Sequence, residues 1–202
     1  MLELDHAYCF VDPAGDWAAR VAAHGLQLDD GTEHRGQGTR NRRLPFAEQF
    51  FEFLWLSARG DAEANPLRLD RRADWRTTGA CPFGICLRGE LTDRAEFWRY
   101  DPPYVPGFSM WIHRSDDAQP AVFVFEAPAD QLERFRPRTR LAATPHLINP
   151  GAIREVRLQL PLAAPAVLAT VTPPILSRIG PPRMEIVTGG APLELAPELA
   201  LA

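Results

Sequence analysis

The stretch that decides the fold lies near the N-terminus, where residues 39–57 read TRNRRLPFAEQFFEFLWLS. Two strand-like runs, residues 39–46 and 49–57, flank a short connection, and this pattern predicts a β-hairpin. Pro45 has no backbone N–H, so it ends the first strand or places that strand at a sheet edge. We therefore expect an antiparallel strand pair here.

Upstream of the hairpin, residues 3–11 (ELDHAYCFV) predict a strand that is buried on both faces. Strict alternation assigns its side chains to two faces: Leu4, His6, Tyr8 and Phe10 to one, and Ala7, Cys9 and Val11 to the other. A helix should follow, with Asp12 as its N-cap and Pro13 at its first position. Gly25 should end the helix, and residues 26–29 fit a short second strand.

The order strand, helix, strand, strand, strand thus fills residues 3–57, and much of it recurs downstream. Residues 58–79 resemble a linker, 83–88 predict a strand, 91–100 a short helix, and 108–114 and 121–127 two further strands. In the C-terminal part we expect strands at 155–160, 184–188 and 192–195 and a short helix near 164–171. The repeated order indicates a duplicated fold.

Composition excludes several classes of function. The chain has 202 residues, a formal net charge of -4 and no Lys, so every basic side chain is Arg. The absence of Lys excludes Schiff-base chemistry and a lysine-bearing phosphate loop. The negative charge without a dominant basic patch argues against nucleic acid as the main partner. We find no apolar stretch of roughly the 18 residues that a membrane span needs.

The N-terminus and the cysteines bear on location. Residues 1–5 carry no basic region of a secretory signal, so we expect a cytoplasmic protein without a membrane partner. The odd number of cysteines (Cys9, Cys81 and Cys86) predicts reduced thiols. Cys9 and Cys86 lie in apolar runs, where a free cysteine usually acts as a small hydrophobic residue.

Three segments of the first half resemble the glyoxalase-like branch of the vicinal oxygen chelate superfamily. These segments are Leu4-Asp5-His6, the run HRGQGTRN at residues 34–41, and Phe51-Glu52-Phe53-Leu54. Residues 119–126 (QPAVFVFE) and 150–152 (PGA) look like further landmarks of that branch. The resemblance is strong through residue 57 and weaker beyond it.

The resemblance implies an α+β fold of paired βαβββ modules, which form cupped mixed β-sheets with helices on their outer faces. On this sequence the first module would span residues 1–57, followed by a linker at 58–82. A second, degenerate module would span 83–127, and residues 128–202 would be a C-terminal extension completing the second half.

In that superfamily a divalent metal lies at the base of the cup, and the match carries two ligand positions over to His6 and Glu52. The residues agree in part, because a carboxylate on the apolar strand face of Glu52 is costly to bury without a cation or hydrogen-bond donors. A metal between imidazole and carboxylate is one solution. A buried His–Glu pair, or a Glu52 that faces solvent, is the alternative.

The second module departs from the pattern, because Gly84 falls where the second histidine ligand is expected. Glu126 or Glu185 could supply the remaining carboxylate, and both lie in strand-like runs. Such a set would suit a divalent ion: Mn, Fe, Mg, Zn or Ni. The missing histidine keeps a metal-free pocket as the alternative.

Three residues before and within the hairpin are candidates for substrate binding. His34 could orient a substrate oxygen at the rim of the cup, although a solvated loop histidine is the more frequent case. Arg40 and Asn41 could grip a carboxylate or phosphate of a substrate. They equally fit turn and edge positions.

These features favour a metal-dependent enzyme of the isomerase, lyase or dioxygenase type that acts on a small oxygenated metabolite. The metal would act as a Lewis acid, and Glu52 would carry a proton as the catalytic residue. A metal-free module that binds a small ligand in the same cup is the competing hypothesis. A homodimeric scaffold that pairs through the exposed edges of the cup is a third.

Overall fold

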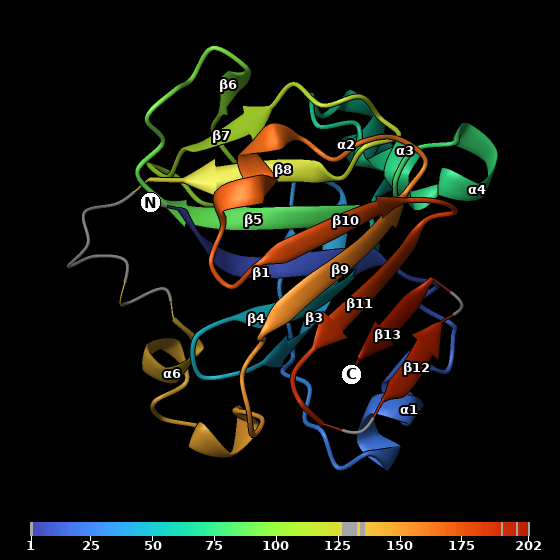
Figure 1. Ribbon diagram of the computed structural model, residues 1–202, viewed down its shortest axis with the longest axis vertical. Helices are drawn as coiled ribbons and strands as arrows, with labels where there is room; N and C mark the ends of the chain where they lie inside the picture. Colours follow the sequence, from blue (N-terminus) through green and yellow to red (C-terminus); the bar gives the residue numbers. More distant parts are fainter. Residues whose placement is uncertain (1, 127–132, 134–135, 191, 197, 202) are drawn as a thin grey trace.

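The computed structural model describes residues 2–126, 133, 136–190, 192–196 and 198–201, and it is built on two β-sheets (Figure 1). The larger sheet has eight strands in the order β2-β3-β4-β1-β5-β8-β7-β6. The strands are β1 (Leu2–Phe10), β2 (Glu33–His34), β3 (Thr39–Pro45), β4 (Phe50–Leu56), β5 (Phe83–Gly89), β6 (Phe97–Tyr100), β7 (Met110–His113) and β8 (Ala121–Phe125).

The eight-stranded sheet consists of two halves with the same strand arrangement. β1 runs parallel to β4 in the first half, β5 runs parallel to β8 in the second, and β1 pairs antiparallel with β5 at the centre. The predicted hairpin is confirmed as the antiparallel pair β3 and β4. The predicted fold class, α+β with paired modules and cupped mixed sheets, is confirmed as well.

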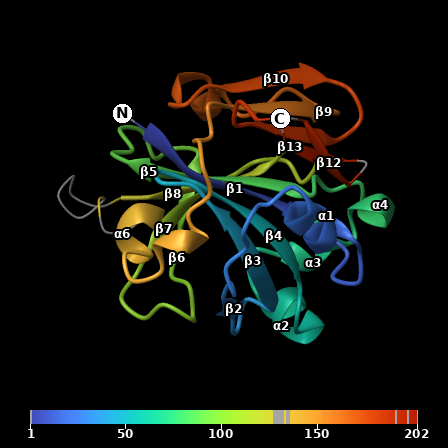
Figure 2. The ribbon, with the colours of Figure 1, turned by 90° about the horizontal axis from the view of Figure 1, so that it is seen from below.

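The second sheet covers one face of the first. It has five strands in the order β10-β9-β11-β13-β12. They are β9 (Glu155–Leu160), β10 (Ile175–Ile179), β11 (Arg183–Val187), β12 (Leu193–Ala196) and β13 (Leu199–Leu201). Figure 2 shows this sheet over the convex face of the larger sheet, whose ends at β2 and β6 curl away from it. The larger sheet takes all of its described strands from residues 2–125.

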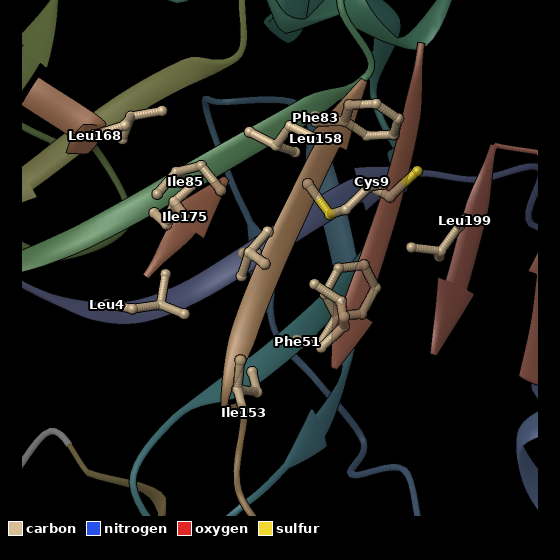
Figure 3. Packing of buried hydrophobic residues seen from close by; sticks show 14 of the residues in the cluster. Leu4, Cys9, Phe51, Phe83, Ile85, Ile153, Leu158, Leu168, Ile175 and Leu199 are labelled. Atoms are coloured by element: carbon tan, nitrogen blue, oxygen red, sulfur yellow. The ribbon is translucent and has the colours of Figure 1, made fainter. Parts of the chain in front are cut away.

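A single apolar core lies between the two sheets. Leu4, Cys9 and Ile85 of the larger sheet pack there with Leu158 and Leu199 of the smaller one (Figure 3). This sheet-on-sheet packing replaces the predicted cover of helices on the outer face. A sheet strand can bury an apolar row without any helix, provided that a second sheet faces it.

The helices are few and short. They are α1 (Trp17–Ala23), α2 (Arg59–Ala64), α3 (Leu69–Ala73), α4 (Trp75–Thr78), α6 (Pro137–Arg140) and the 3-10 turns η2 (Pro145–Leu147) and η3 (Ala166–Thr170). The segment predicted as a linker thus folds into α2, α3 and α4. No helix among the described residues is long and apolar enough to cross a membrane.

Three local predictions are wrong. The first helix begins at Trp17 rather than at Pro13, since the Asp12 carboxylate caps a turn by accepting from the Ala14 N–H at 2.9 Å. The short second strand lies at residues 33–34 instead of 26–29. The helix expected at residues 91–100 is absent, because Phe97 and Tyr100 belong to β6, which pairs with β7.

β1 contains an irregularity that decides which residues reach the functional face. Its register with β5 shifts between Leu4 and His6, and such a bulge moves later side chains to the other face of a strand. Leu4 and Ala7 therefore both pack in the core between the sheets. The prediction that Leu4 shares a face with His6 is wrong for this reason.

Candidate functional site

A cavity of about 100 Å³ opens on the concave face of the larger sheet, on the side away from the second sheet. Its walls combine polar groups with apolar ones. The lining residues are His6, Tyr8, His34, Gln37, Glu52, Leu54, Leu69, Cys86, Tyr104, Met110 and Phe123. Convergent polar groups in an otherwise apolar pocket are typical of a small-molecule site.

His6 and Glu52 meet at this cavity from neighbouring strands. The Nε2 atom of His6 lies 3.8 Å from Oε2 of Glu52, and the residue Glu52 is only 8% exposed. The imidazole of His6 stacks on the ring of Phe50 with a centroid distance of 4.4 Å. The structure thus brings together the two residues that the sequence predicted as a pair.

A buried ion pair supports His6 from behind. The Nδ1–H of His6 donates to Oδ2 of Asp5 at 2.7 Å, and the Arg88 guanidinium donates to Oδ1 of the same carboxylate at 2.9 Å. The side chain of Arg88 is fully buried and also donates to the Glu48 carbonyl at 3.2 Å. This arrangement fixes the orientation of the His6 ring and turns its Nε2 atom toward the cavity.

Asn41 holds Glu52 in a similar way. Its side-chain N–H donates to Oε1 of Glu52 at 2.6 Å, while its side-chain oxygen accepts from the Thr32 N–H at 2.6 Å. Both ends of the Asn41 amide are therefore used within the protein. The predicted role of Asn41 as a substrate grip becomes a positioning role for Glu52.

Burial and charge shift the pKa values of the two histidines in opposite directions. Burial lowers the pKa of His6, but the facing Cys86 and Glu52 and the hydrogen bond to Asp5 outweigh burial and hold this pKa well above its usual value. For His34, burial dominates and lowers the pKa. At neutral pH we therefore expect a neutral His34 and, in the metal-free protein, a charged His6 beside Glu52. Binding of an ion at His6 would release the Nε2 proton.

The rim of the cavity carries neutral hydrogen-bonding groups. His34 is buried, shares a 2.9 Å hydrogen bond between its Nδ1 and Oγ1 of Thr39, and packs on the Tyr104 ring at 4.6 Å. Burial raises the pKa of Tyr104 and of Tyr8, so both hydroxyls keep their protons. His34 thus lines the cavity as a buried residue and is not the solvated loop histidine that the sequence offered as the more frequent case.

The other predicted site residues lie elsewhere. Arg40 is exposed and, as the strand neighbour of Asn41, it projects from the opposite face of β3. The Glu126 carboxylate binds the Leu91 N–H, Arg94 and the Trp111 indole. Glu185 lies in the second sheet, where it accepts from Arg157 at 3.0 Å. The structure therefore separates both glutamates from the His6–Glu52 cavity.

The second half of the sheet offers no polar side chain at the positions that correspond to His6 and Glu52. Residue Gly84 takes the place of His6, and the parallel register of β5 and β8 puts Phe123 in the place of Glu52. The Tyr8 ring lies directly over Gly84, where an added Cβ atom would be 2.0 Å from Tyr8 Cε1. The polar site is therefore built by one half of the sheet.

Sequence reasoning missed Asp5, Arg88 and Cys86. The sequence signal for Arg88 was present, because an arginine inside the apolar run FGICLRG needs a buried partner. Asp5 was not assigned to the site, since strict alternation places it on the face away from His6. Only the bulge in β1 brings it to the imidazole.

The chain is similar to known proteins. The sequence matches the family described as the glyoxalase-like domain over residues 4–147. A hypothetical protein from Staphylococcus aureus aligns with a TM-score of 0.54 and 14% identity, covering 100% of this chain and 99% of that chain. A methylmalonyl-CoA epimerase from Mycobacterium tuberculosis aligns with a TM-score of 0.38 and 14% identity, over 64% of this chain and 90% of that chain. A search of curated proteins finds no match.

Proposed function

This chain belongs to the glyoxalase-like domain family, and from that premise we propose that it is an enzyme acting on a small oxygenated metabolite at the His6–Glu52 pair. The observation that carries the proposal is the 3.8 Å approach of His6 Nε2 to Glu52 Oε2 at the cavity. A hydrogen bond orients each of the two side chains: Asp5 holds His6, and Asn41 holds Glu52. Such orientation is what a reaction centre requires.

A divalent ion fits between the two side chains. The distance of 3.8 Å between His6 Nε2 and Glu52 Oε2 is too long for a hydrogen bond. It is shorter than roughly 4.2 Å, the largest distance between two ligand atoms that each lie about 2.1 Å from the same ion. The Asp5–His6 hydrogen bond also matches the carboxylate–histidine pair that commonly supports a metal ligand. We propose that His6 and Glu52 hold an ion from the set Mn, Fe, Mg, Zn or Ni, which would supply Lewis-acid chemistry toward substrate oxygens.

Glu52 is the residue that we assign to proton transfer. A carboxylate has about four lone pairs. Asn41 takes one on Oε1 and an ion would take one on Oε2, so the carboxylate keeps others with which to take a proton from, or return one to, a carbon or oxygen of the substrate. This use of Glu52 fits isomerase and lyase reactions, in which a proton moves within the substrate or leaves it. The tyrosine hydroxyls of Tyr8 and Tyr104 remain protonated and can donate to a substrate oxygen.

The apolar walls limit the size of the substrate. Leu54, Leu69, Met110 and Phe123 close the sides of a cavity of only about 100 Å³. That volume suits the reacting part of a compact metabolite. Apolar surroundings also strengthen the electrostatic interactions of the buried Glu52 and its neighbour His6.

Metal analysis tests this proposal. The protein is purified without a histidine tag, supplied with Mn²⁺, Zn²⁺ or Ni²⁺, and compared with Glu52→Gln. A matched control is Glu185→Gln, which removes a carboxylate of the second sheet. We expect about one ion per chain in the wild type and the control, and its loss in Glu52→Gln.

Absence of metal from the wild type at sufficient supply would favour the second candidate, a metal-free module that binds a small ligand in the same cavity. The replacement of two ligand positions by Gly84 and Phe123 is the observation that favours this candidate. A cytoplasmic location and a homodimer also remain part of the proposal. Fractionation of cells and sedimentation of the purified protein test these two points.

A further inference from the structure

Two arginines meet beside the candidate cavity, in a hollow that the proposed function does not use. The hollow has a volume of about 20 Å³ and is lined by Arg43, Phe50 and Arg140, together with Asp29 and three apolar residues. The guanidinium carbon of each arginine lies 5.8 Å from the centre of the Phe50 ring. The same ring stacks on the imidazole of His6, so the hollow adjoins the candidate reaction centre.

Strand pairing places this hollow on the concave face of the larger sheet. Arg43 on β3 is the cross-strand partner of Glu52 on β4, and Phe50 on β4 is the partner of His6 on β1. Directly paired residues extend to the same face of a sheet. The side chains of Arg43 and Phe50 therefore lie on the same face as the cavity.

The three arginines in and next to α6 differ in their partners. Arg136 and Arg138 both donate to the Glu48 carboxylate. The Arg138 N–H also donates at 3.1 Å to a carbonyl of the turn between β3 and β4, which holds α6 against this turn. Within the described part of the chain, the Arg140 guanidinium has neither an ion pair nor a hydrogen bond, and it lies over the Phe50 ring instead.

Arg43 also keeps donors that no described residue uses. Its backbone N–H and its Nε donate to the Asp29 carboxylate at 3.0 and 2.6 Å. Its two terminal nitrogens have no hydrogen-bond partner among the described residues, so they can donate to a ligand. Burial of the guanidinium and the like charge of Arg43 lower the pKa of Arg140, which indicates that the two cations lie close to each other.

We propose that Arg140 and Arg43 bind an oxyanion, a carboxylate or a phosphate, at one end of the substrate whose other end reacts at Glu52. A guanidinium presents its N–H donors in a fixed fork that matches the oxygens of both groups. The inference rests on the proposed function, because it assigns a charged end to the same substrate. It narrows the substrate class to small acidic metabolites. The sequence suggested such a grip at Arg40, which projects from the other face of β3.

The sizes and charges of the two spaces agree with a substrate of this kind. The cavity has about 100 Å³ for the reacting part, and the hollow has room for about one oxygen-sized atom. An anion inside the cavity would face the Glu52 carboxylate, whereas at Arg140 it meets a cation. We therefore expect the charged end of the substrate over Phe50 and its neutral end in the cavity.

Titration with small anions tests the proposal. Phosphate and acetate are added separately to the tag-free protein without added metal, at low ionic strength, and acetamide serves as the neutral control. Arginine Nε–H signals are followed by NMR. We expect one signal, which Arg140→Gln lacks, to shift saturably with phosphate or acetate and to stay in place with acetamide. The ratio of the two affinities shows whether phosphate or carboxylate is the preferred group.

The variant Arg140→Gln should weaken anion binding by at least about 10-fold, followed through the Arg43 signal, because charge-assisted hydrogen bonds are lost. Arg40→Gln is the matched control, since it removes one exposed arginine from the other face and should keep the wild-type affinity. Both substitutions replace exposed side chains, so the urea midpoint of unfolding should not change.

Equal affinities of the wild type and Arg140→Gln, or no saturable shift in the wild type, would overturn the oxyanion site. A shift confined to the ring signals of His6 would place the anion at the imidazole and overturn it as well. None of these results would affect the metal analysis of His6 and Glu52. The proposed function fails separately, when the wild type binds no ion.

Discussion

The two halves of the eight-stranded sheet have the same strand arrangement but opposite chemistry. The β1–β4 half directs His6 and Glu52 to the cavity, whereas the corresponding positions of the β5–β8 half are Gly84 and Phe123. A duplicated fold therefore does not need to carry a duplicated site. Both halves have the backbone arrangement of the cup, but the side chains of only one half place polar groups at these two positions.

Each half is stabilised by a different kind of contact. In the first half, Asp5 and Asn41 hydrogen-bond the buried polar groups, and Arg88 reaches Asp5 from β5 of the other half. In the second half, Gly84 gives room for close packing of the Tyr8 ring. Substitutions in the two halves should therefore destabilise the protein for different reasons, and four predictions test that contrast.

The largest effect is expected from Arg88→Met, which removes the cation that reaches the polar half from β5. This change leaves the Asp5 carboxylate buried without its cation, and breaking a buried pair in this way costs about 3–5 kcal/mol. Urea unfolding measures the loss. Arg40→Met is the matched control, since an exposed arginine should change stability by less than about 0.5 kcal/mol. Equal losses in both variants would contradict the importance of the buried pair.

In the apolar half, Gly84→Ala should destabilise the protein through the Tyr8 ring. The added methyl group would lie 2.0 Å from Tyr8 Cε1, and overpacking of this kind costs about 1–3 kcal/mol. In a Tyr8→Leu background the same change should cost less, because the ring is gone. Thermal unfolding of the double-mutant cycle measures this coupling. An equal loss of stability from Gly84→Ala in both backgrounds would contradict the explanation.

Gly60→Ala serves as the control for that cycle, because no heavy atom lies within 4 Å of an added Cβ atom there. Gly60 lies in α2, where alanine is favoured over glycine by up to about 1 kcal/mol. We expect a neutral or slightly stabilising effect. A loss comparable to that of Gly84→Ala would point to a general glycine effect instead of packing under Tyr8.

Asn41→Leu should remove the hydrogen bond to Glu52 and leave this carboxylate with one donor fewer. We expect a loss of about 1–3 kcal/mol, the usual effect of leaving a buried acceptor unsatisfied. Metal affinity should fall in the same variant, by about 10- to 100-fold, as for other residues that orient ligands. Isothermal titration with Zn²⁺ measures it, and an unchanged affinity would contradict the positioning role.

The smallest effect concerns pH and separates the two histidines. The folded-state pKa of His6 is raised, so its contribution to stability is present below the unfolded value of about 6.5 and is lost as pH rises through the folded pKa. The pKa of His34 is lowered, so its protonation favours the unfolded state as pH falls below about 6.5.

Imidazole NMR titration of the metal-free protein measures both values directly. We expect the His6 resonance to titrate above, and the His34 resonance below, the ordinary histidine range. In the wild type we expect the unfolding free energy to decline as pH rises above about 6.5, and His6→Gln should lose this decline. Two histidines that titrate together would contradict the contrast between their environments.

Much of the fold and part of the site could be predicted from the sequence. Aromatic and aliphatic runs predicted the hairpin of residues 39–57, and motif resemblance led to the glyoxalase-like fold, which is confirmed. His6 and Glu52 were predicted as neighbours, and the structure brings them together. The apolar runs sufficed for the hairpin, and the resemblance to the family supplied the His6–Glu52 pair.

The remaining features depend on long-range contacts that periodicity does not encode. A bulge in β1 brings Asp5 to His6, and only the pairing of β1 with β5 places Arg88 and Cys86 nearby. Glu126 was in a strand-like run, but it lies just after β8 and binds Arg94 and Trp111. Residues 97–100 looked helical, yet pairing with β7 makes them a strand.

The central claim is that His6 and Glu52 form one metal-binding reaction centre on the concave face. Crystals of the tag-free protein grown with Zn²⁺, measured above and below the zinc absorption edge, test it most directly. We predict an anomalous peak within about 2.0–2.2 Å of both His6 Nε2 and Glu52 Oε2. A fully loaded crystal with no peak between these atoms, or with the ion bound elsewhere, would contradict the account.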